Sequence, residues 1–455
     1  MNKKWIATLA AVALTATAFA AKPKTPSYPS YLTVEVMPDY EKGKKVMATV
    51  VMPKAWTPIP ADLVIPDGVT HIGGFDDCTS IRSVTIPKSV KVISQNSFKR
   101  CTSLKGIFGG TIAQWNAISG EGKQYFTSVH CTDGTLGMTE VPMYLVMEGM
   151  KITGCDKNKL PDNLVIPEGV TEIGRSAFKE CTYLESVTIP SSVTSIGGDL
   201  YNGAFRGCTS LKKVVIPDSV TEIQENTFYE CVSLNAVIIP DSVTKIGRYA
   251  FAGCTSLESV TIGKGVTLIY QSAFGGCTSL KNIVIPESVT VIGGGAFAGC
   301  TSLAGIAIPN SVKDIGESAF FGCTSLVNIM IPNNVTEIRD KAFKNCTSLA
   351  SIMIPNNVTS IGSSAFEKCT SFTSIVIPRG VTSINGSAFA DCKSLKSVSI
   401  PRSVTSIGSH AFSKCPNLSV QYDGTKAQWE AISKYPVTFD KGITIRCTDG
   451  NIVVN

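Results

Sequence analysis

The side chains with the widest chemical repertoire in this chain are its sixteen cysteines and three histidines. Cysteine forms disulfides, binds metals or acts as a nucleophile, and histidine binds metals or transfers protons. None of His71, His130 and His410 stands at ligand spacing from a cysteine cluster, so we expect no metal site and no cofactor. Motifs of serine hydrolases, zinc hydrolases and phosphate-binding loops are absent, so we predict no catalytic residues and no enzyme.

Ten cysteines follow one another at a fixed interval of 23 residues: Cys208, Cys231, Cys254, Cys277, Cys300, Cys323, Cys346, Cys369, Cys392 and Cys415. A constant period of this length is the signature of a repeat solenoid, in which each coil buries its apolar face against its neighbours. The pattern therefore predicts a thin continuous core and a long regular surface. Such a surface favours binding over catalysis.

Ten thiols at one position of identical coils would stack with parallel Cα–Cβ bonds. That geometry suits a buried ladder of reduced thiols better than bridges. Disulfides within the ladder are the alternative, because cysteine-rich exported proteins commonly contain them, and a metal ladder is the least favoured reading. Cys131, Cys155 and Cys447 lie off the ladder, and we expect them to be exposed or paired.

Residues 257–277 illustrate one coil. The segment Leu-x-x-Val-x-Ile predicts a short strand, which a following Pro usually ends, and Val-Thr-x-Ile predicts a second one. The next Gly (Gly247, Gly293 and Gly316 in other coils) is expected to adopt a positive φ, and Ala-Phe a tight turn or short 3₁₀ piece. The side chains expected to point inward are Leu257, Val260, Ile262, Val266, Ile269, Phe274 and Cys277.

The ends of the array are duplicated. Residues 110–119 and 424–433 share a Gly-Thr-x-Ala-Gln-Trp-x-Ala-Ile-Ser pattern with capping-box spacing, and each precedes a Cys-Thr-Asp-Gly turn. We expect short helices whose Trp115 and Trp429 cap the core, a ligand site at these two Trp being the alternative. The domains would be a short module at 21–138 and a long module of about eleven coils at 139–455.

The first twenty residues have the layout of a secretory signal peptide, with Lys3 and Lys4 before an apolar run and Ala18-Phe-Ala as the cleavage pattern. We therefore expect export to the cell surface, the medium or the periplasm, with no transmembrane segment after the signal is removed. The formal net charge of +6 is weak and scattered, so nucleic acid is not an expected partner.

The outward residue between the inward Val and Ile of each first strand is unusually apolar. A purely structural reading is that β-branched residues suit strands. The functional reading is a stripe for contact with other proteins or with copies of the same chain. Its apolar members are Val215, Ile238, Val284, Ala307, Met330, Met353 and Val376.

The repeated Leu-x-x-Val-x-Ile-Pro-x-Ser-Val-Thr-x-Ile-Gly-x-x-Ala-Phe-x-x-Cys-Thr-Ser pattern resembles the BspA-like, Treponema-type leucine-rich repeats. The resemblance implies a leucine-rich-repeat solenoid on a secreted or cell-surface bacterial protein. It also implies adhesin-like binding to host matrix or plasma proteins or to bacterial surface proteins, through what we expect to be the concave strand face. The alternative is a structural or self-associating envelope protein with no host ligand.

Overall fold

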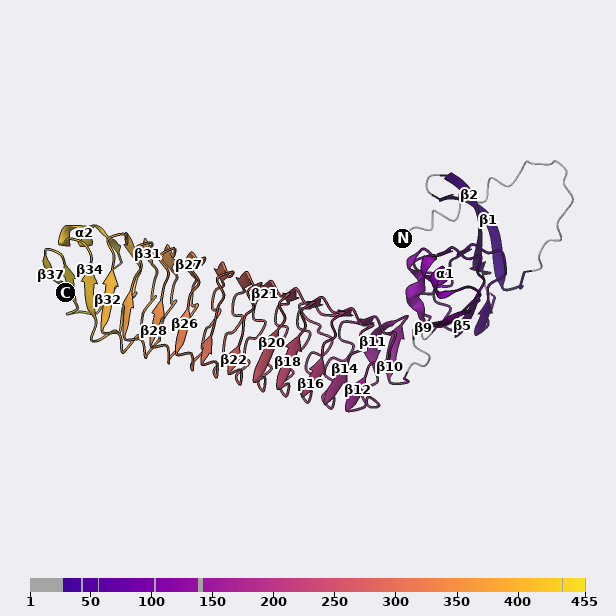
Figure 1. Cartoon of the computed structure of the whole chain (residues 1–455), viewed down its shortest axis with the longest axis horizontal. Coiled ribbons are helices and arrows are strands. Elements are labelled where there is room, and N and C mark those ends of the chain that lie inside the picture. The colour runs from indigo at the N-terminus through magenta and orange to yellow at the C-terminus, as the bar shows by residue number, and fades with distance from the viewer. Residues whose placement is uncertain are drawn as a thin grey trace.

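The computed structural model describes residues 28–41, 44–55, 57–101, 104–137, 142–435 and 437–454. The predicted signal peptide lies outside these residues. In Figure 1 the described chain forms a short stack of coils followed by a long one. Their buried apolar residues form two separate clusters, one within residues 31–131 and one within 144–454.

The short stack begins with a long antiparallel hairpin, continues with parallel coils and ends with a helix and a second hairpin. Its elements are β1 (Leu32–Glu41), β2 (Lys44–Pro53), β3 (Asp62–Val64), β4 (His71–Ile72), β5 (Ser83–Ile86), β6 (Val92–Ile93), β7 (Leu104–Phe108), α1 (Ile112–Ala117), η1 (Glu121–Tyr125, a 3₁₀ helix), β8 (Phe126–Cys131) and β9 (Gly134–Gly137).

The long stack repeats this order with more coils. It opens with the antiparallel hairpin of β10 (Leu145–Glu148) and β11 (Lys151–Cys155) and closes with α2 (Lys426–Ala431) and a second antiparallel hairpin. The closing hairpin consists of the last two strands of the first face. The strands of this face are β12 (Asn163–Val165), β14 (Ser186–Thr188), β16 (Lys213–Val215), β18 (Ala236–Ile239), β20 (Ser259–Ile262), β22 (Asn282–Ile283), β24 (Gly305–Ile306), β26 (Asn328–Met330), β28 (Ser351–Met353), β30 (Ser374–Val376), β32 (Ser397–Ile400), β34 (Ser419–Tyr422), β36 (Thr444–Cys447) and β37 (Gly450–Val453).

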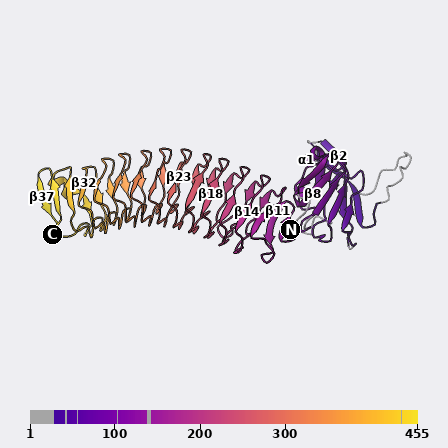
Figure 2. The ribbon, with the colours of Figure 1, turned by 60° about the horizontal axis from the view of Figure 1, so that its bottom comes forward.

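The second face consists of strands of two residues. They are β13 (Glu172–Ile173), β15 (Ser195–Ile196), β17 (Glu222–Ile223), β19 (Lys245–Ile246), β21 (Leu268–Ile269), β23 (Val291–Ile292), β25 (Asp314–Ile315), β27 (Glu337–Ile338), β29 (Ser360–Ile361), β31 (Ser383–Ile384), β33 (Ser406–Ile407) and β35 (Ser433–Lys434). On both faces neighbouring coils pair in parallel, and Figure 2 shows how regularly the coils succeed one another.

The predicted strands and inward side chains of the coil are confirmed. In residues 257–277 all seven predicted core side chains are at most 8% exposed. The Ala-Phe segment forms the predicted turn and links the coils through its backbone, because Phe274 N–H donates to the Ala296 carbonyl of the next coil at 2.9 Å. Each coil therefore bonds to its neighbours along two strand faces and one column of turns.

The aromatic rings of these turns stack into a continuous column. From Phe178 to Phe439 successive rings lie 5.1 to 5.6 Å apart, as in the Phe297–Phe320 pair at 5.6 Å. The angle between stacked ring planes never exceeds 10° in this series, because successive coils repeat the same conformation. The column supplies much of the apolar contact between coils.

The expected positive φ of Gly247, Gly293 and Gly316 is wrong. Gly247 and Gly316 do not have a positive φ; their space is limited instead, since a Cβ on Gly316 would lie 2.3 Å from the Gly294 nitrogen of the preceding coil. The left-handed residue comes two positions later, where Tyr249 and Ser318 have φ of 55° and 58°. Glycine is therefore selected here by close approach of two backbones.

The ten ladder cysteines are free and buried, as predicted. Each Sγ donates to the carbonyl of a Phe in the preceding coil, as Cys277 does to Phe251 at 3.2 Å. The expectation for the other cysteines is wrong in two cases, because Cys131 and Cys447 are only 2% and 9% exposed. Cys131 ends β8 and Cys447 ends β36, so each occupies a buried position at the end of the first strand of a terminal hairpin.

Native alkylation should therefore separate the thiols into two classes. We expect iodoacetamide to modify the half-buried Cys78 and Cys155 in the native protein, and the ladder thiols only after denaturation, since a buried, protonated thiol is not a nucleophile. Peptide mass spectrometry of both samples measures this. Modification of Cys254 or Cys277 at native pH, or disulfide-linked peptides between ladder positions, would contradict the buried ladder.

Both predicted caps are present. Thr111 accepts from the backbone N–H of Gln114, whose side chain accepts in turn from the Thr111 N–H, and Thr425 with Gln428 does the same. These capping boxes fix the helices that carry Trp115 and Trp429, which are 5% and 3% exposed. Such burial favours the structural reading of the two Trp over a ligand site.

Candidate protein-binding surface

The structure places the predicted stripe on the solvent side of the first strand face. Val284, Met353 and Val376 are 75%, 73% and 72% exposed, while Ile352, before Met353 in β28, is buried and Ile354, just after the strand, is half-buried. Strand register puts the members on one row, because Val284 pairs with Ala307 and Met330 with Met353 on successive coils. The remaining predicted members, Val215 and Ile238, are also exposed and lie on β16 and β18.

The row is interrupted by polar residues at its two ends. Thr261 separates Ile238 from Val284, and Ser399 follows Val376. The uninterrupted part therefore runs over five coils, from Val284 to Val376. With coils about 4.8 Å apart, this part is roughly 20 Å long.

The middle of this stripe has no charged neighbours on its own face. Over three coils, the solvent-facing residues of each first strand and of the positions beside it are all neutral: Ala304, Gly305, Ala307, Asn310, Val327, Asn328, Met330, Asn333, Ala350, Ser351, Met353 and Asn356. Charged residues return on the neighbouring coils, at Glu287 and Arg379. We call the twelve neutral residues of the three coils, named above from Ala304 to Asn356, the neutral patch. Depletion of charge around exposed apolar side chains is typical of the centre of a protein interface.

The neutral patch is also hollowed. Gly305 and Ala307 put little or no side chain where Met330 and Met353 project from the next two coils. A depression of about 430 Å³ lies there, with Ile306, Met330 and Met353 in its wall. A Cβ on Gly305 would meet nothing within 4 Å, so the space is open to a partner. A second depression runs beside it along the coil corners from Val284 to Asn356, with Glu287 at one end.

Several charged side chains of the long stack are paired from coil to coil. Lys281 and Glu258 are 2.8 Å apart, and Lys344 and Glu367 are also 2.8 Å apart. Each pair joins residues 23 positions apart on neighbouring coils. The Lys281–Glu258 pair is exposed, and exposed pairs of this kind contribute little to stability.

Sequence reasoning missed three exposed apolar residues at the same strand position. Val165 in β12 is 63% exposed, and Val64 and Ile107 in the short stack are 49% and 48% exposed. Val64 and Val165 each precede an Ile-Pro pair, so the repeat pattern would have found them had it been applied to the first coil of each stack.

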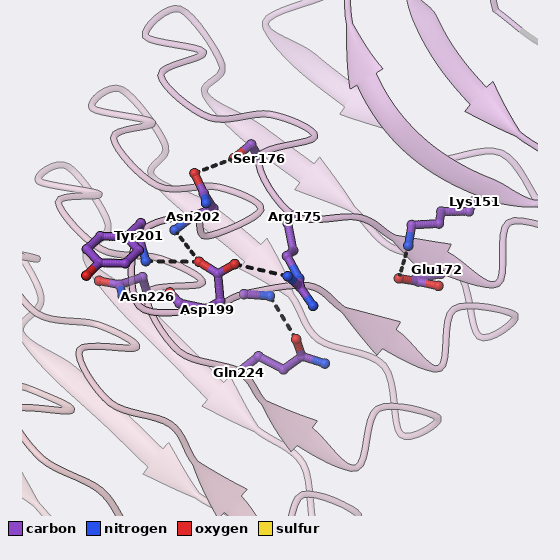
Figure 3. Close-up of polar contacts among 10 residues, drawn as sticks. Lys151, Glu172, Arg175, Ser176, Asp199, Tyr201, Asn202, Gln224 and Asn226 are labelled. Carbon is purple, nitrogen blue, oxygen red and sulfur yellow. Dashed lines mark hydrogen bonds and ion pairs between the residues drawn. The ribbon is translucent and has the colours of Figure 1, made fainter. Parts of the chain in front are cut away.

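A four-residue insertion lengthens the coil between Cys181 and Cys208, and residues 197–203, shown in Figure 3, form a second exposed feature there. Asp199 organises it: its carboxylate accepts from the backbone N–H of Tyr201 and Asn202, both at 2.9 Å, and pairs with Arg175 at 3.1 Å. The backbone N–H of Tyr201 contributes most to lowering the pKa of Asp199. The loop thus held presents Tyr201, which is 73% exposed.

We looked for metal sites and membrane-spanning helices in the part of the chain that the structure describes and found neither. No group of three or more His, Cys, Asp or Glu side chains there is placed to hold a metal ion. Within the same residues, no helix has the length and apolar character needed to cross a bilayer.

Comparison with known proteins agrees with this fold. The family described as "BspA type Leucine rich repeat region" matches residues 60–116, 155–203, 198–326 and 292–419. A leucine-rich repeat protein from Bacteroides ovatus is 26% identical (TM-score 0.49; 89% of this chain and 98% of that one covered). A leucine rich cell surface protein from Faecalibacterium prausnitzii is 26% identical (TM-score 0.38; 87% and 97% covered). The T. pallidum leucine rich repeat protein is 30% identical (TM-score 0.34; 48% and 91% covered).

A search of curated proteins found no match. The family match covers most of the chain and includes the strands that carry the stripe. This chain therefore belongs to the BspA-type leucine-rich-repeat family.

Proposed function

We propose that this protein binds other proteins through the neutral patch and acts as an exported, adhesin-like binding protein at or near the bacterial surface. The observation that carries the proposal is the coincidence of exposed Met and Val side chains, absent charge and a depression on one rigid strand face. Methionine is suited to such a surface because its flexible, polarisable side chain adapts to different partners. Export is supported by the signal-peptide pattern of the first twenty residues.

Apolar contact sets the expected behaviour of the complex. Because the neutral patch has no charged side chain, its binding should persist when salt is raised, unlike an attraction between surface charges. The depression is suited to receive an apolar side chain of the partner, which would be desolvated between Met330 and Met353. The rigid coils beneath it would lose little conformational freedom on binding.

Met330 and Met353 lie in the neutral patch, and Val284 borders it on the preceding coil, where it pairs with Ala307. Replacing the three together by Ser should weaken binding about tenfold or more, because it removes the exposed apolar side chains that a partner would contact. The fold should persist, since exposed strand substitutions usually change stability by less than about 1 kcal/mol each. Circular dichroism measures the fold. Biolayer interferometry against immobilised plasma and matrix proteins, and light scattering of the protein alone, measure the association.

The matched control is the triple replacement of Val64, Ile107 and Val165 by Ser. These residues have the same strand position and are exposed, though less so than the three tested residues, and they neither belong to nor border the neutral patch, so binding should be unchanged. Ala307→Arg is a second test variant. The Arg side chain would fill the depression and introduce a charge, so this variant should also bind more weakly. Wild-type binding by a folded Val284/Met330/Met353 variant would contradict the proposal. Loss of dimerisation without loss of any plasma or matrix contact would favour the self-associating alternative.

A further inference from the structure

Two thiols meet where the opening hairpin of the long stack packs on its first coil. Cys155 ends β11, Cys181 follows the first Phe turn, and their Sγ atoms are 3.4 Å apart. Both cysteines are reduced here; Cys155 is half-buried and Cys181 is 4% exposed. A disulfide requires an S–S distance of about 2.05 Å, so the sulfurs need to approach by roughly 1.4 Å.

Cys181 differs from the later ladder thiols in its partner. Cys231 and Cys254 each donate to the carbonyl of a Phe that lies 26 residues earlier, at 3.2 Å. Within the long stack, no coil with a Phe turn precedes the first coil, and the residue 26 positions before Cys181 is Cys155. A second thiol therefore takes the place of a carbonyl oxygen, and a bond between the two sulfurs becomes chemically available at this position.

We propose that Cys155 and Cys181 form a reversible disulfide when the protein meets a low-molecular-weight disulfide such as oxidised glutathione, and that this bond fastens the opening hairpin to the first coil. The sulfur of Cys155 attacks the oxidant as thiolate, breaks its S–S bond and releases one glutathione thiolate. The sulfur of Cys181 then attacks Cys155 in the mixed disulfide and releases the second. The two protons of the cysteine thiols pass to the released thiolates, so that one oxidised glutathione is reduced to two glutathione thiols.

The surroundings select this pair for exchange. The hydrogen bond between the two thiols lowers the pKa of Cys155, while it and burial raise that of Cys181, so Cys155 is the first nucleophile. Lys157 also favours the Cys155 thiolate. The short stack offers a natural comparison: its opening strand β2 contains no cysteine, so the half-buried Cys78 of its first coil has no such partner.

The bond would act on the open end of the long core. The opening hairpin places Met147 and Ile152 over that core with 2% and 0% exposure, and β11 pairs with β13 over only two residues. End coils of a solenoid have a neighbour on one side only and open first. A cross-link that closes a 26-residue loop restricts this opening.

The test uses the full chain incubated with oxidised glutathione, alkylated after acid quench and mapped without reduction. The proposal expects a cross-linked peptide pair containing Cys155 and Cys181, reversal by dithiothreitol, and amide exchange in residues 145–155 slowed about tenfold in the oxidised protein. Cys155→Ser should abolish both the cross-link and the slowing. Cys78→Ser should leave both unchanged.

Three results would overturn the proposal. One is a stable glutathione adduct on Cys155 with no cross-link. Another is a cross-link that joins Cys155 or Cys181 to other cysteines as often as to each other. The third is an oxidised protein whose hairpin exchanges as fast as that of the reduced one. Because Cys155 is half-buried at a strand end, its Ser variant is expected to fold, so these outcomes remain measurable.

Discussion

Raising the pH from about 8.5 to about 11 is expected to unfold the long stack steeply. Burial raises the pKa of Cys254 and Cys323 from 9.0 to about 12, and it raises those of Cys231 and Cys277 as well. Below the unfolded-state value the thiols are protonated in both states and pH has no effect through them. Between the two values only the unfolded chain releases these protons, so stability falls as pH rises.

Each fully buried thiol should contribute about 1 kcal/mol of destabilisation per pH unit in that interval, and the effects of many ladder positions accumulate. Denaturant titrations followed by circular dichroism at a series of pH values give the slope. The slope of the free energy of unfolding against pH reports how many protons the chain releases when it unfolds. Replacing Cys254, Cys277 and Cys300 by Ala should lower that number by about three, whatever the variant's stability at neutral pH. An unchanged slope would mean that Lys and Tyr, not the thiol ladder, cause the alkaline transition.

Trp429→Ala should open the C-terminal end of the long stack first. The indole lies 5.1 Å from the Tyr422 ring and 5.9 Å from that of Phe439, the last ring of the aromatic column. Removing a packed Trp costs about 3–5 kcal/mol. A solenoid loses that stability locally, so hydrogen exchange should accelerate within residues ~390–454 before it does in earlier coils.

Trp115→Ala is the matched variant, since Trp115 occupies the same capping helix of the short stack. If the two stacks are independent domains, it should accelerate exchange in residues ~104–137 and leave the C-terminal coils unchanged. Trp429→Phe should retain most of the protection. Unaltered exchange near residue 429 in the Ala variant would show that the indole is not a cap.

Much of the architecture follows from local rules repeated at one spacing. The position of Phe274 inside the coil, the strand that ends at Ile262 and the helix N-caps at Thr111 and Thr425 each depend on a few neighbouring residues. Repetition then makes one correct coil sufficient for its neighbours. The outward row of Val284 and Met330 follows from the same alternation, because adjacent side chains of a strand point to opposite faces.

The missed features depend on contacts between coils. Gly316 gives no local sign that its Cβ would meet the backbone of Gly294, and a positive φ is the more familiar reason for glycine. Cys131 and Cys447 precede turn motifs that read as exposed, but each is a buried residue at the end of the first strand of a terminal hairpin. The contact of Cys155 with Cys181 joins two different kinds of element, so the 23-residue period does not predict it.

The repetition of the same contacts from coil to coil also has a genetic consequence. A thiol, a ring and a Thr hydroxyl recur along the coils at this spacing, and each makes the same contact with the neighbouring coil: Phe274 stacks on Phe251, the Cys277 thiol donates to the Phe251 carbonyl, and the Thr278 hydroxyl donates to the Thr255 carbonyl at 3.2 Å. An in-frame recombination event that removes or duplicates a whole coil therefore joins two surfaces that already fit. Variants of different length can arise without any new interface having to evolve. Only the coil with the four-residue insertion and the two capped ends resist such exchange, and the length of the strand face becomes a heritable variable.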